Sequence, residues 1–357
     1  MARLAVTPSR AVPPSPAPAP SPRRRAQQME FHSTAPVRLD LAGGWTDVAP
    51  FAEREGGLVV NAAVQLSVHV ELRLGGNGLR LESRDQGLVI DCPRASDLVA
   101  DGQLDLHKAA LRMFPVQHGC QLATWSDIPA GSGLGSSGAL DVALVAVLAR
   151  VRGERMTERE LAEHAWHLET VEAGIPGGKQ DQYAAALGGF NRLSFHGADT
   201  GIEPITLDPG FAAELERQTL LCYTGRSRIS GTTIARVMDA YQRGDGGVRS
   251  ALQGIKEAAQ RMGEALRGGD LAKVGGILAE NWRHQQALDS EMSTPEMRQL
   301  ERAMQGAGLL GGKAAGSGAG GCMFFIVRTP DIAKRAALEL GATVLPVSWA
   351  TEGARAW

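Results

Sequence analysis

Glycine and serine dominate the segment PAGSGLGSSGA at residues 129–139, and an apolar stretch follows it directly. From Ala139 to Val151 hydrophobic residues recur at helical spacing, so the loop is expected to lead into a helix. Glycine lets a backbone wrap closely around a ligand, and the free N–H groups and dipole of a helix start favour an anion. The segment therefore predicts a phosphate-binding turn. The alternative is a flexible turn before a core helix, although a plain turn does not need six glycines and serines.

The spacing GxGxxG occurs twice, at 133–138 and at 316–321. This spacing is weak evidence alone, because 44 of the 357 residues are glycine and such matches arise by chance. A dinucleotide site requires a parallel βαβ unit, whereas the residues before 129 read as meandering strands. Lys313 is followed by Ala314, so no GxxxxGK[ST] motif exists, and HRD and DFG are absent too. P-loop and protein-kinase folds are thus disfavoured, and an oxidoreductase rests only on the lone glycine spacing.

Short β-like runs separated by turns fill the chain from residue 36 to residue 92. Their content of valine, isoleucine and leucine and their Gly/Asn boundaries predict strands at 37–42, 57–74, 79–84 and 87–92. A helix around 104–113 and a strand near 120–127 should follow. A charged helix is expected from the N-cap candidate Thr157 to Gly174.

The pattern changes near 195–215, which is the candidate domain boundary. Beyond it the spacing predicts long amphipathic helices at about 230–243, 247–266, 269–289 and 295–306, and then a glycine-rich segment that leads into a strand. We expect an N-terminal domain over 30–205 and a C-terminal domain over 206–357.

Residues 1–29 form a tail rich in proline and arginine, with five arginines and no acidic residue. Such a composition cannot bury enough apolar surface to fold, so we expect disorder. Three interpretations stay open for it: an inert extension or misassigned start with Met29 as the true first residue, a targeting signal, and an interaction arm.

The charge balance bears on partners. The whole chain has a formal net charge of −2, and without the arginine-rich tail it has −7. This acidity argues against a nucleic-acid partner, and the longest apolar run, at 139–149, is too short for a membrane span. The four cysteines are far apart and form no CxxC pair, which favours free thiols and a cytoplasmic protein.

The segment at 129–139 closely resembles the central motif of the GHMP small-molecule kinases. In the family's order, RLDLAGGWTDVAPFAEREGGLVVNAAV at 38–64 resembles the substrate motif of the sugar-kinase branch, and GGKAAGSGAGGCMFF at 311–325 resembles the third motif. GIPGGKQDQYAAALGGF at 174–190 is similar to the catalytic-aspartate segment of D-glycero-D-manno-heptose 7-phosphate kinases. The resemblance implies an α+β fold of two domains, the first like ribosomal protein S5 domain 2 and the second ferredoxin-like.

The resemblance also implies ATP as co-substrate and Mg²⁺ as cofactor. The residues matching the family's phosphate cradle are Pro129, Gly131, Ser132, Gly133, Leu134, Gly135, Ser136, Ser137 and Gly138. Ser137, with Ser136 as the alternative, matches the hydroxyl ligand of magnesium. Glu169 matches its carboxylate ligand, with Glu172 as the competitor, and a solvated helix-face carboxylate is the plain alternative for either.

Asp181 matches the aspartate that faces the acceptor hydroxyl, and Arg38 matches an arginine beside it that stabilises charge or keeps the aspartate ionised. The plain alternative for Arg38 is a surface strand residue, and for Trp45 it is a core position. The residues that the resemblance assigns to the acceptor are Gly43, Gly44, Trp45, Thr46, Asp47, Lys179, Gly318, Ala319 and Gly320. For the last three, a tight turn between domains is the alternative.

The motifs favour two different acceptors. KQDQY at 179–183 and YTGRSR at 223–228 resemble heptose 7-phosphate kinases, which act at the anomeric oxygen, whereas LAGGWTD at 41–47 is equally similar to L-fucokinases. Lys179, Arg226 and Arg228 could bind a substrate phosphate, or could be solvated surface charges. Against this, 283–288 contains glutamines where the heptose enzymes usually have lysines.

The expected activity is ATP-dependent phosphorylation of the C1 hydroxyl of D-glycero-D-manno-heptose 7-phosphate. An L-fucokinase or another free-sugar 1-kinase is the first alternative. A catalytically silent sensor of sugar or nucleotide is the alternative from another class. The sequence indicates no particular oligomeric state.

Overall fold

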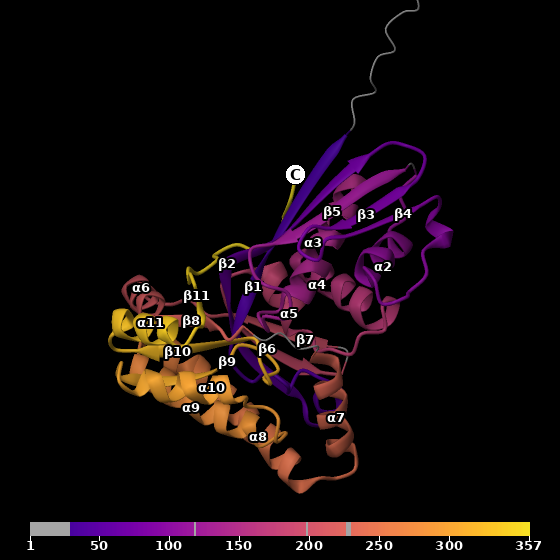
Figure 1. Cartoon of the computed structure of the whole chain (residues 1–357). Coiled ribbons are helices and arrows are strands. Elements are labelled where there is room, and N and C mark those ends of the chain that lie inside the picture. Colours follow the sequence, from indigo (N-terminus) through magenta and orange to yellow (C-terminus); the bar gives the residue numbers. More distant parts are fainter. Residues whose placement is uncertain (1–28, 118, 198, 226–229) are drawn as a thin grey trace, which may run out of the picture.

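The computed structural model describes residues 29–117, 119–197, 199–225 and 230–357. Within these ranges the strands form two sheets, which Figure 1 shows side by side. The larger has eight strands in the order β12-β1-β2-β5-β3-β4, and β6 pairs with both β2 and β7. Its strands are β1 (Glu30–Ala42), β2 (Gly57–Leu74), β3 (Leu79–Ser83), β4 (Leu88–Cys92), β5 (Cys120–Ser126), β6 (Phe190–His196), β7 (Asp199–Pro204) and β12 (Arg355–Ala356).

Pairing in the larger sheet is antiparallel except between β3 and β5. This agrees with the meander that the sequence predicts and excludes a Rossmann sheet, whose strands are mostly parallel. β2 changes character along its length: residues 57–64 are all buried, whereas buried and more exposed positions alternate from Gln65 onward. The first part of β2 is therefore the part that runs through the interior.

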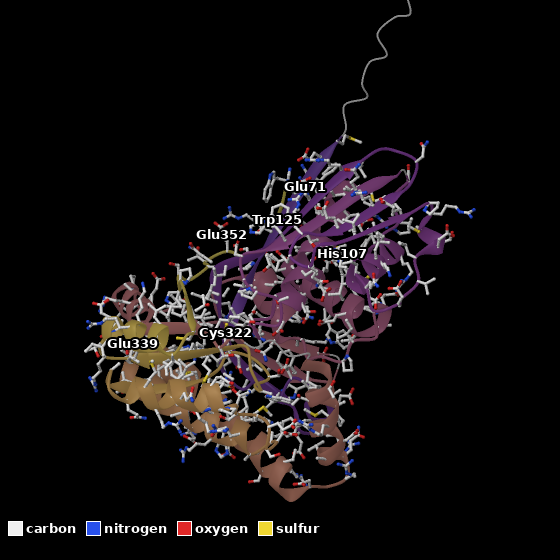
Figure 2. The ribbon with its side chains drawn as sticks, in the orientation of Figure 1. Glu71, His107, Trp125, Cys322, Glu339 and Glu352 are labelled. Carbon is white, nitrogen blue, oxygen red and sulfur yellow. The ribbon has the colours of Figure 1, made fainter. Side chains whose placement is uncertain are left out.

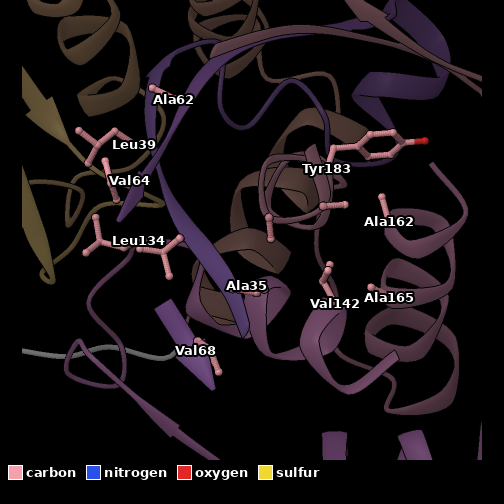
Figure 3. Packing of buried hydrophobic residues seen from close by; sticks show 14 of the residues in the cluster. Ala35, Leu39, Ala62, Val64, Val68, Leu134, Val142, Ala162, Ala165 and Tyr183 are labelled. Carbon is pink, nitrogen blue, oxygen red and sulfur yellow. The ribbon is translucent and has the colours of Figure 1, made fainter. Parts of the chain in front are cut away.

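Among the described residues, the chain forms five α-helices between β1 and β6. Helix α3 packs on β1 and β2 and contacts α2, α4 and α5 on its other sides, which explains why it is apolar nearly all round. Figure 3 shows Leu39 and Val64 of the strands, Val142 of α3 and Tyr183 of α5 in this core. The helices are α1 (Phe51–Glu55), α2 (Asp105–Met113), α3 (Ser136–Val151), α4 (Glu158–His167) and α5 (Gln180–Leu187).

The helix expected over 157–174 is interrupted. Thr157 is its N-cap and forms a capping box with Glu160, as the sequence predicts. However, the α-helix ends at His167, and residues Leu168–Glu172 form a π-helical turn. Such turns are rare and often occur at functional sites.

The smaller sheet has the order β11-β8-β10-β9 and is entirely antiparallel. Its strands are β8 (Thr219–Tyr223), β9 (Leu309–Ala314), β10 (Cys322–Val327) and β11 (Thr343–Leu345). The four long helices predicted beyond residue 230 are confirmed, with ends that differ by at most three residues. The helices here are α6 (Pro209–Gln218), α7 (Ser230–Gln242), α8 (Gly246–Arg267), α9 (Leu271–Gln286), α10 (Pro295–Gln305) and α11 (Pro330–Glu339).

The end of the chain returns to the larger sheet. Ala350 donates its N–H to the Ala63 carbonyl, and β12 pairs with the start of β1. Accordingly, Glu352 lies beside the larger sheet in Figure 2, away from Glu339 on α11. The predicted boundary at 205/206 falls between β7 and α6, where the chain leaves this sheet, and the exact bounds of the two domains stay a prediction.

Two further expectations concern side-chain chemistry and hydropathy. All four cysteines are free thiols, and three of them are buried. Among the described residues, none of the helices has both the length and the apolar character that a membrane span requires.

Candidate active site

The phosphate loop, residues 129–135, connects β5 to α3. Gly131, Gly133 and Gly135 have φ angles of 70°, 78° and 75°, in the left-handed region that favours glycine. Gly135 is the N-cap of α3 and no side chain caps the helix there, so the first-turn N–H groups are available to a ligand. The helix starts at Ser136, three residues earlier than its apolar periodicity indicates, and this puts Ser136 and Ser137 in the first turn.

Arg38 of β1 connects three parts of the site. Its Nε and Nη2 lie 2.8 and 2.7 Å from Oδ1 of Asp181, and its Nη1 donates to the carbonyls of Gly133 and Ala315, each at 2.8 Å. Only 5% of Arg38 is exposed, so it is not a surface strand residue. One buried guanidinium thus holds the predicted catalytic carboxylate against the phosphate loop.

Asp181 is the second residue of α5 and packs on glycines of the phosphate segment. A Cβ at Gly138 would lie 2.6 Å from the Cβ of Asp181, and one at Gly135 would lie 3.0 Å from its Cγ. Any side chain at these positions would push Asp181 away from the loop. The side chain of Asp181 is 28% exposed, so a bound molecule can reach it.

Ser137 and Glu169 come together although 32 residues separate them. The hydroxyl of Ser137 donates to Oε1 of Glu169, and Nε2 of Gln182 donates to Oε2 at 2.6 Å. Burial raises the pKa of Glu169 to about 7, and the charge of Asp181 adds to this, against the two hydrogen bonds. Oε1 of Glu172, the competing candidate, instead lies 3.7 Å from Nε2 of His167. A hydroxyl and a carboxylate oxygen suit the hard Mg²⁺ ion, so the donor set fits it.

The acceptor loop, residues 43–47, is held from two directions. Gly43 donates its N–H to Oδ1 of Asn281 on α9, and Gly44 donates to Oδ1 of Asp40, each at 3.1 Å. The hydroxyl of Thr46 donates to the carbonyls of Gly43 and Leu58. Hydrogen bonds therefore tie the loop to α9 and β2.

Trp45 is the middle residue of the acceptor loop and has a left-handed backbone conformation. It has a φ of 83°, and its ring is buried in an apolar cluster with Phe51 and helices of the second sheet. This matches the core alternative for Trp45. Its Nε1 has no hydrogen-bond partner within the described structure, so contact with a sugar stays a prediction.

Asp47 offers a free carboxylate oxygen close to Asp181. Its Oδ2 accepts the N–H of Gln180 at 3.1 Å, while its buried Oδ1 has no partner among the described residues. Burial raises the pKa of Asp47 to about 6, and the charges of Asp181 and Asp40 add to this, against the Gln180 hydrogen bond. This oxygen can accept a hydrogen bond from a ligand hydroxyl.

The closing loop, residues 315–321, touches the phosphate loop through backbone. Gly316 lies against the carbonyl of Gly133, and Cys322, directly after the loop, donates its N–H to the carbonyl of Ser132 at 2.6 Å. Gln285 donates its side-chain amide to the carbonyl of Gly316 at 2.8 Å. Ala319 has a φ of 62° and donates its N–H to the carbonyl of Met292. Gly318 also lies against Met292, so these predicted acceptor residues face the α9–α10 connection.

Lys179 interacts with two residues of α4, Glu163 and Trp166. Its ammonium lies 2.9 and 2.8 Å from the two carboxylate oxygens of Glu163, and over the ring of Trp166 at 4.5 Å from the centroid. A substrate phosphate would have to compete with Glu163 for it. Arg226 and Arg228 lie outside the described residues.

Sequence reasoning missed a buried ion pair that joins the two sheets. The Nζ of Lys313 on β9 donates to Oδ2 of Asp40 at 2.6 Å and to the carbonyls of Asp40 and Ala314 at 2.9 and 3.0 Å. Lys313 is 0% and Asp40 2% exposed. The available signal was a charged residue inside each of two apolar strand runs, VRLDLA and LLGGKAA.

Asn281 and Gln285 were missed as well. They lie one turn apart on α9, are buried, and hold Gly43 of the acceptor loop and Gly316 of the closing loop. The glutamine-rich segment 283–288 thus contributes a loop contact through Gln285.

Comparison with known proteins identifies the family of this chain. The family model described as "GHMP kinases N terminal domain" matches residues 104–189, and "GHMP kinases C terminal" matches residues 257–345. The D-glycero-alpha-D-manno-heptose 7-phosphate kinase of Campylobacter jejuni is 32% identical over 90% of this chain and 97% of its own length.

Two other relatives extend the comparison. The bifunctional fucokinase/GDP-fucose pyrophosphorylase of Arabidopsis thaliana is 28% identical over 84% of this chain and 30% of its own length. The crystal structure of a D-glycero-D-manno-heptose 1-phosphate kinase from Bacteroides thetaiotaomicron superposes with a TM-score of 0.75 at 27% identity, over 92% of this chain and 98% of that one. Both parts of the chain thus match one family in order, and the chain belongs to the GHMP kinases, as a sugar kinase that uses ATP.

Proposed function

We propose that this kinase transfers the γ-phosphoryl group of ATP to the C1 hydroxyl of D-glycero-D-manno-heptose 7-phosphate. One observation carries the proposal: Asp181, held by Arg38 against the phosphate loop, adjoins Gln180, whose N–H binds Asp47. A sugar hydroxyl bound to the free oxygen of Asp47 therefore lies beside Asp181. The choice of heptose is supported by the 32% sequence identity, over 90% of this chain, with a kinase named for that sugar.

In this mechanism Asp181 accepts or orients the proton of the attacking hydroxyl. Arg38 orients Asp181 through the two contacts to its Oδ1 and stabilises negative charge on the transferred group. The backbone N–H groups at the start of α3 bind phosphate oxygens together with the hydroxyls of the loop. Mg²⁺, bound by Ser137 and Glu169, would neutralise charge on the β- and γ-phosphates. Gly318, Ala319 and Gly320 would limit the acceptor pocket from the second sheet.

A free-sugar kinase acting on L-fucose is the second candidate. The observation favouring it is that three buried cations described in the site, Arg38, Lys179 and Lys313, each have a carboxylate partner. A 7-phosphate would require Lys179 to leave Glu163, or cations from the segment at 226–229. The fucokinase relative, whose match covers 84% of this chain and 30% of the larger relative, supports the same candidate.

A sugar panel separates the candidates. With ATP and Mg²⁺, a coupled assay for ADP should report rapid turnover with the heptose 7-phosphate and weak turnover with the unphosphorylated heptose, L-fucose and galactose. Heptose 1-phosphate should give no turnover, because its C1 oxygen is already substituted. Proton-coupled phosphorus NMR of the product should show a phosphate on the anomeric carbon. Turnover of L-fucose above that of the heptose 7-phosphate would reject the heptose assignment and keep the family activity.

The Michaelis constant for the sugar should depend on pH through Asp47. Its pKa of about 6 means that the carboxylate is protonated below that pH, and a protonated acid loses an acceptor for sugar hydroxyls. We expect KM for the sugar to rise about tenfold per pH unit below about 6, while KM for ATP changes less.

The matched variant is Asp47→Asn, because a sugar phosphate itself titrates near this pH. In the variant, KM for the sugar should be higher than in the wild type. Its pH dependence should be weaker, because only the titration of the substrate phosphate is left. An unchanged profile in Asp47→Asn would assign the effect to the substrate and contradict the prediction.

A further inference from the structure

Helix α3 contains a carboxylate that the mechanism above does not use. Asp141 is 0% exposed, and neither of its side-chain oxygens has a hydrogen-bond partner among the described residues. Its neighbours on the helix, from Ala139 to Ala149, are almost all apolar and buried. An unpaired buried carboxyl group is destabilising, so such a residue needs a compensating role.

The position of Asp141 on the helix directs it toward the catalytic groups. It lies three residues after Gly138, which packs on Asp181, and four residues after Ser137, which binds Glu169. Residues at these spacings share a helix face. Consistent with this, the pKa of Asp141 is raised well above its ordinary value by burial and by the negative charges of Glu169 and Asp181.

The unsatisfied atoms in this region have the same chemical character. Besides the two oxygens of Asp141, Oε1 of Gln182 is buried without a partner in the described structure, and Gln182 is the residue that binds Glu169. With Asp141 in its ionised form, all three atoms are acceptors that carry negative charge or partial charge. A hydrated cation supplies what they lack, because it offers positive charge and water molecules that donate hydrogen bonds.

We propose that Asp141 is a further carboxylate of the divalent-cation site, acting on the ion together with Ser137 and Glu169. The inference rests on the proposed ATP- and magnesium-dependent function and deepens it. Mg²⁺ usually keeps several of its water ligands, so Asp141 can contribute through such a water or through its charge. Replacing an outer-sphere group, which contacts the metal's ligands and not the metal itself, commonly changes metal affinity by about 10- to 100-fold.

The proposal predicts that replacing Asp141 raises the melting temperature of the metal-free protein but weakens its metal binding. If Asp141 only supported the fold, replacing it would lower the melting temperature. If it is kept for the cation, removing an unpaired buried carboxylate should raise the melting temperature of the metal-free protein by a few degrees. The same change should weaken binding of the ion.

The experiment uses Asp141→Asn, which keeps the shape, and Asp141→Leu, which suits an apolar helix. Binding of Mn²⁺ in the presence of a non-hydrolysable ATP analogue is followed by electron paramagnetic resonance of the free ion. Both variants should bind Mn²⁺ about 10- to 100-fold more weakly than the wild type. Binding of the analogue in EDTA should not change. The control Asp91→Asn, at an exposed residue that pairs with Arg80 on the neighbouring strand, should bind Mn²⁺ as the wild type does.

The outcomes separate this inference from the proposed function. Wild-type Mn²⁺ affinity in both Asp141 variants would overturn the inference and leave the proposed function standing. A lower melting temperature in both variants would assign Asp141 to the fold and overturn it too. Absence of Mn²⁺ binding by the wild type with the nucleotide analogue would reject the cation site itself, and the inference with it.

Discussion

Replacing Asp181 with asparagine is expected to lower kcat by about 10²- to 10⁴-fold while the protein stays folded and binds ATP. Asparagine has the same shape but cannot take up the proton of an attacking hydroxyl, and it removes the negative partner of Arg38. Arg38 is buried, but its Nη1 keeps the hydrogen bonds to the carbonyls of Gly133 and Ala315, and the asparagine oxygen can still accept from its other nitrogens. The change should therefore cost some stability without unfolding the protein. The coupled ADP assay measures kcat, and calorimetry measures binding of a non-hydrolysable ATP analogue.

A matched control is Asp85→Asn, in the exposed turn between β3 and β4, which should keep full turnover. Activity of Asp181→Asn within a factor of about 3 of the wild type would remove Asp181 from the catalytic role, since loss of a general base costs far more. Loss of analogue binding along with activity would instead indicate that Asp181 holds the phosphate loop in shape through Arg38.

Lys313→Met is expected to be the most destabilising single change among those considered, at about 3–5 kcal/mol of the free energy of unfolding. The substitution leaves Asp40 charged, buried and without its ammonium partner. Burial lowers the pKa of Lys313, while the charge and the hydrogen bond of Asp40 raise it, so Lys313 depends on Asp40 for its charged form. The midpoint and slope of urea unfolding measure the effect.

Two comparisons make this result specific. Arg80→Met breaks the exposed pair with Asp91, whose side chains are 45% and 67% exposed, and should cost at most about 1 kcal/mol. The double variant Asp40→Leu with Lys313→Met should regain most of the lost stability, because no charge is left unpaired. It should still raise KM for the sugar, because Gly44 loses its acceptor. Equal losses for Lys313→Met and Arg80→Met would contradict the buried-pair argument.

Local signals predicted much of the fold. The run at 57–74 became β2 with the same bounds, and Thr157 caps α4, because alternation and capping depend on neighbours in the sequence. The π-helical turn at 168–172 was not predictable in this way. It depends on tertiary contacts, in which Glu169 turns toward Ser137 and Gln182. Helix α5 was missed because it is short and lies between glycines, which hide any periodicity.

The sequence predicted the site residues that belong to a recognisable motif. It did not predict side-chain contacts that depend on a partner residue from another helix or strand. The structure brings Arg38, Ser137, Glu169 and Asp181 together, as the motifs indicated. The engagement of Lys179 by Glu163 depends on the packing of α4 against α5, which single-sequence patterns do not reveal. The buried charge of Lys313 likewise makes sense only once β9 faces β1.

The return of the chain end to β1 has a consequence for movement and for dissection of the molecule. Because β12 pairs with β1, the smaller sheet and its helices are topologically an insertion into the chain of the larger sheet. Any hinge between the two sheets must bend at two crossings, near 205–208 and near 346–348, and both must bend together. A fragment that stops at residue 205 would lack the strand that covers the edge of β1, so the two parts cannot be separated by a single cut.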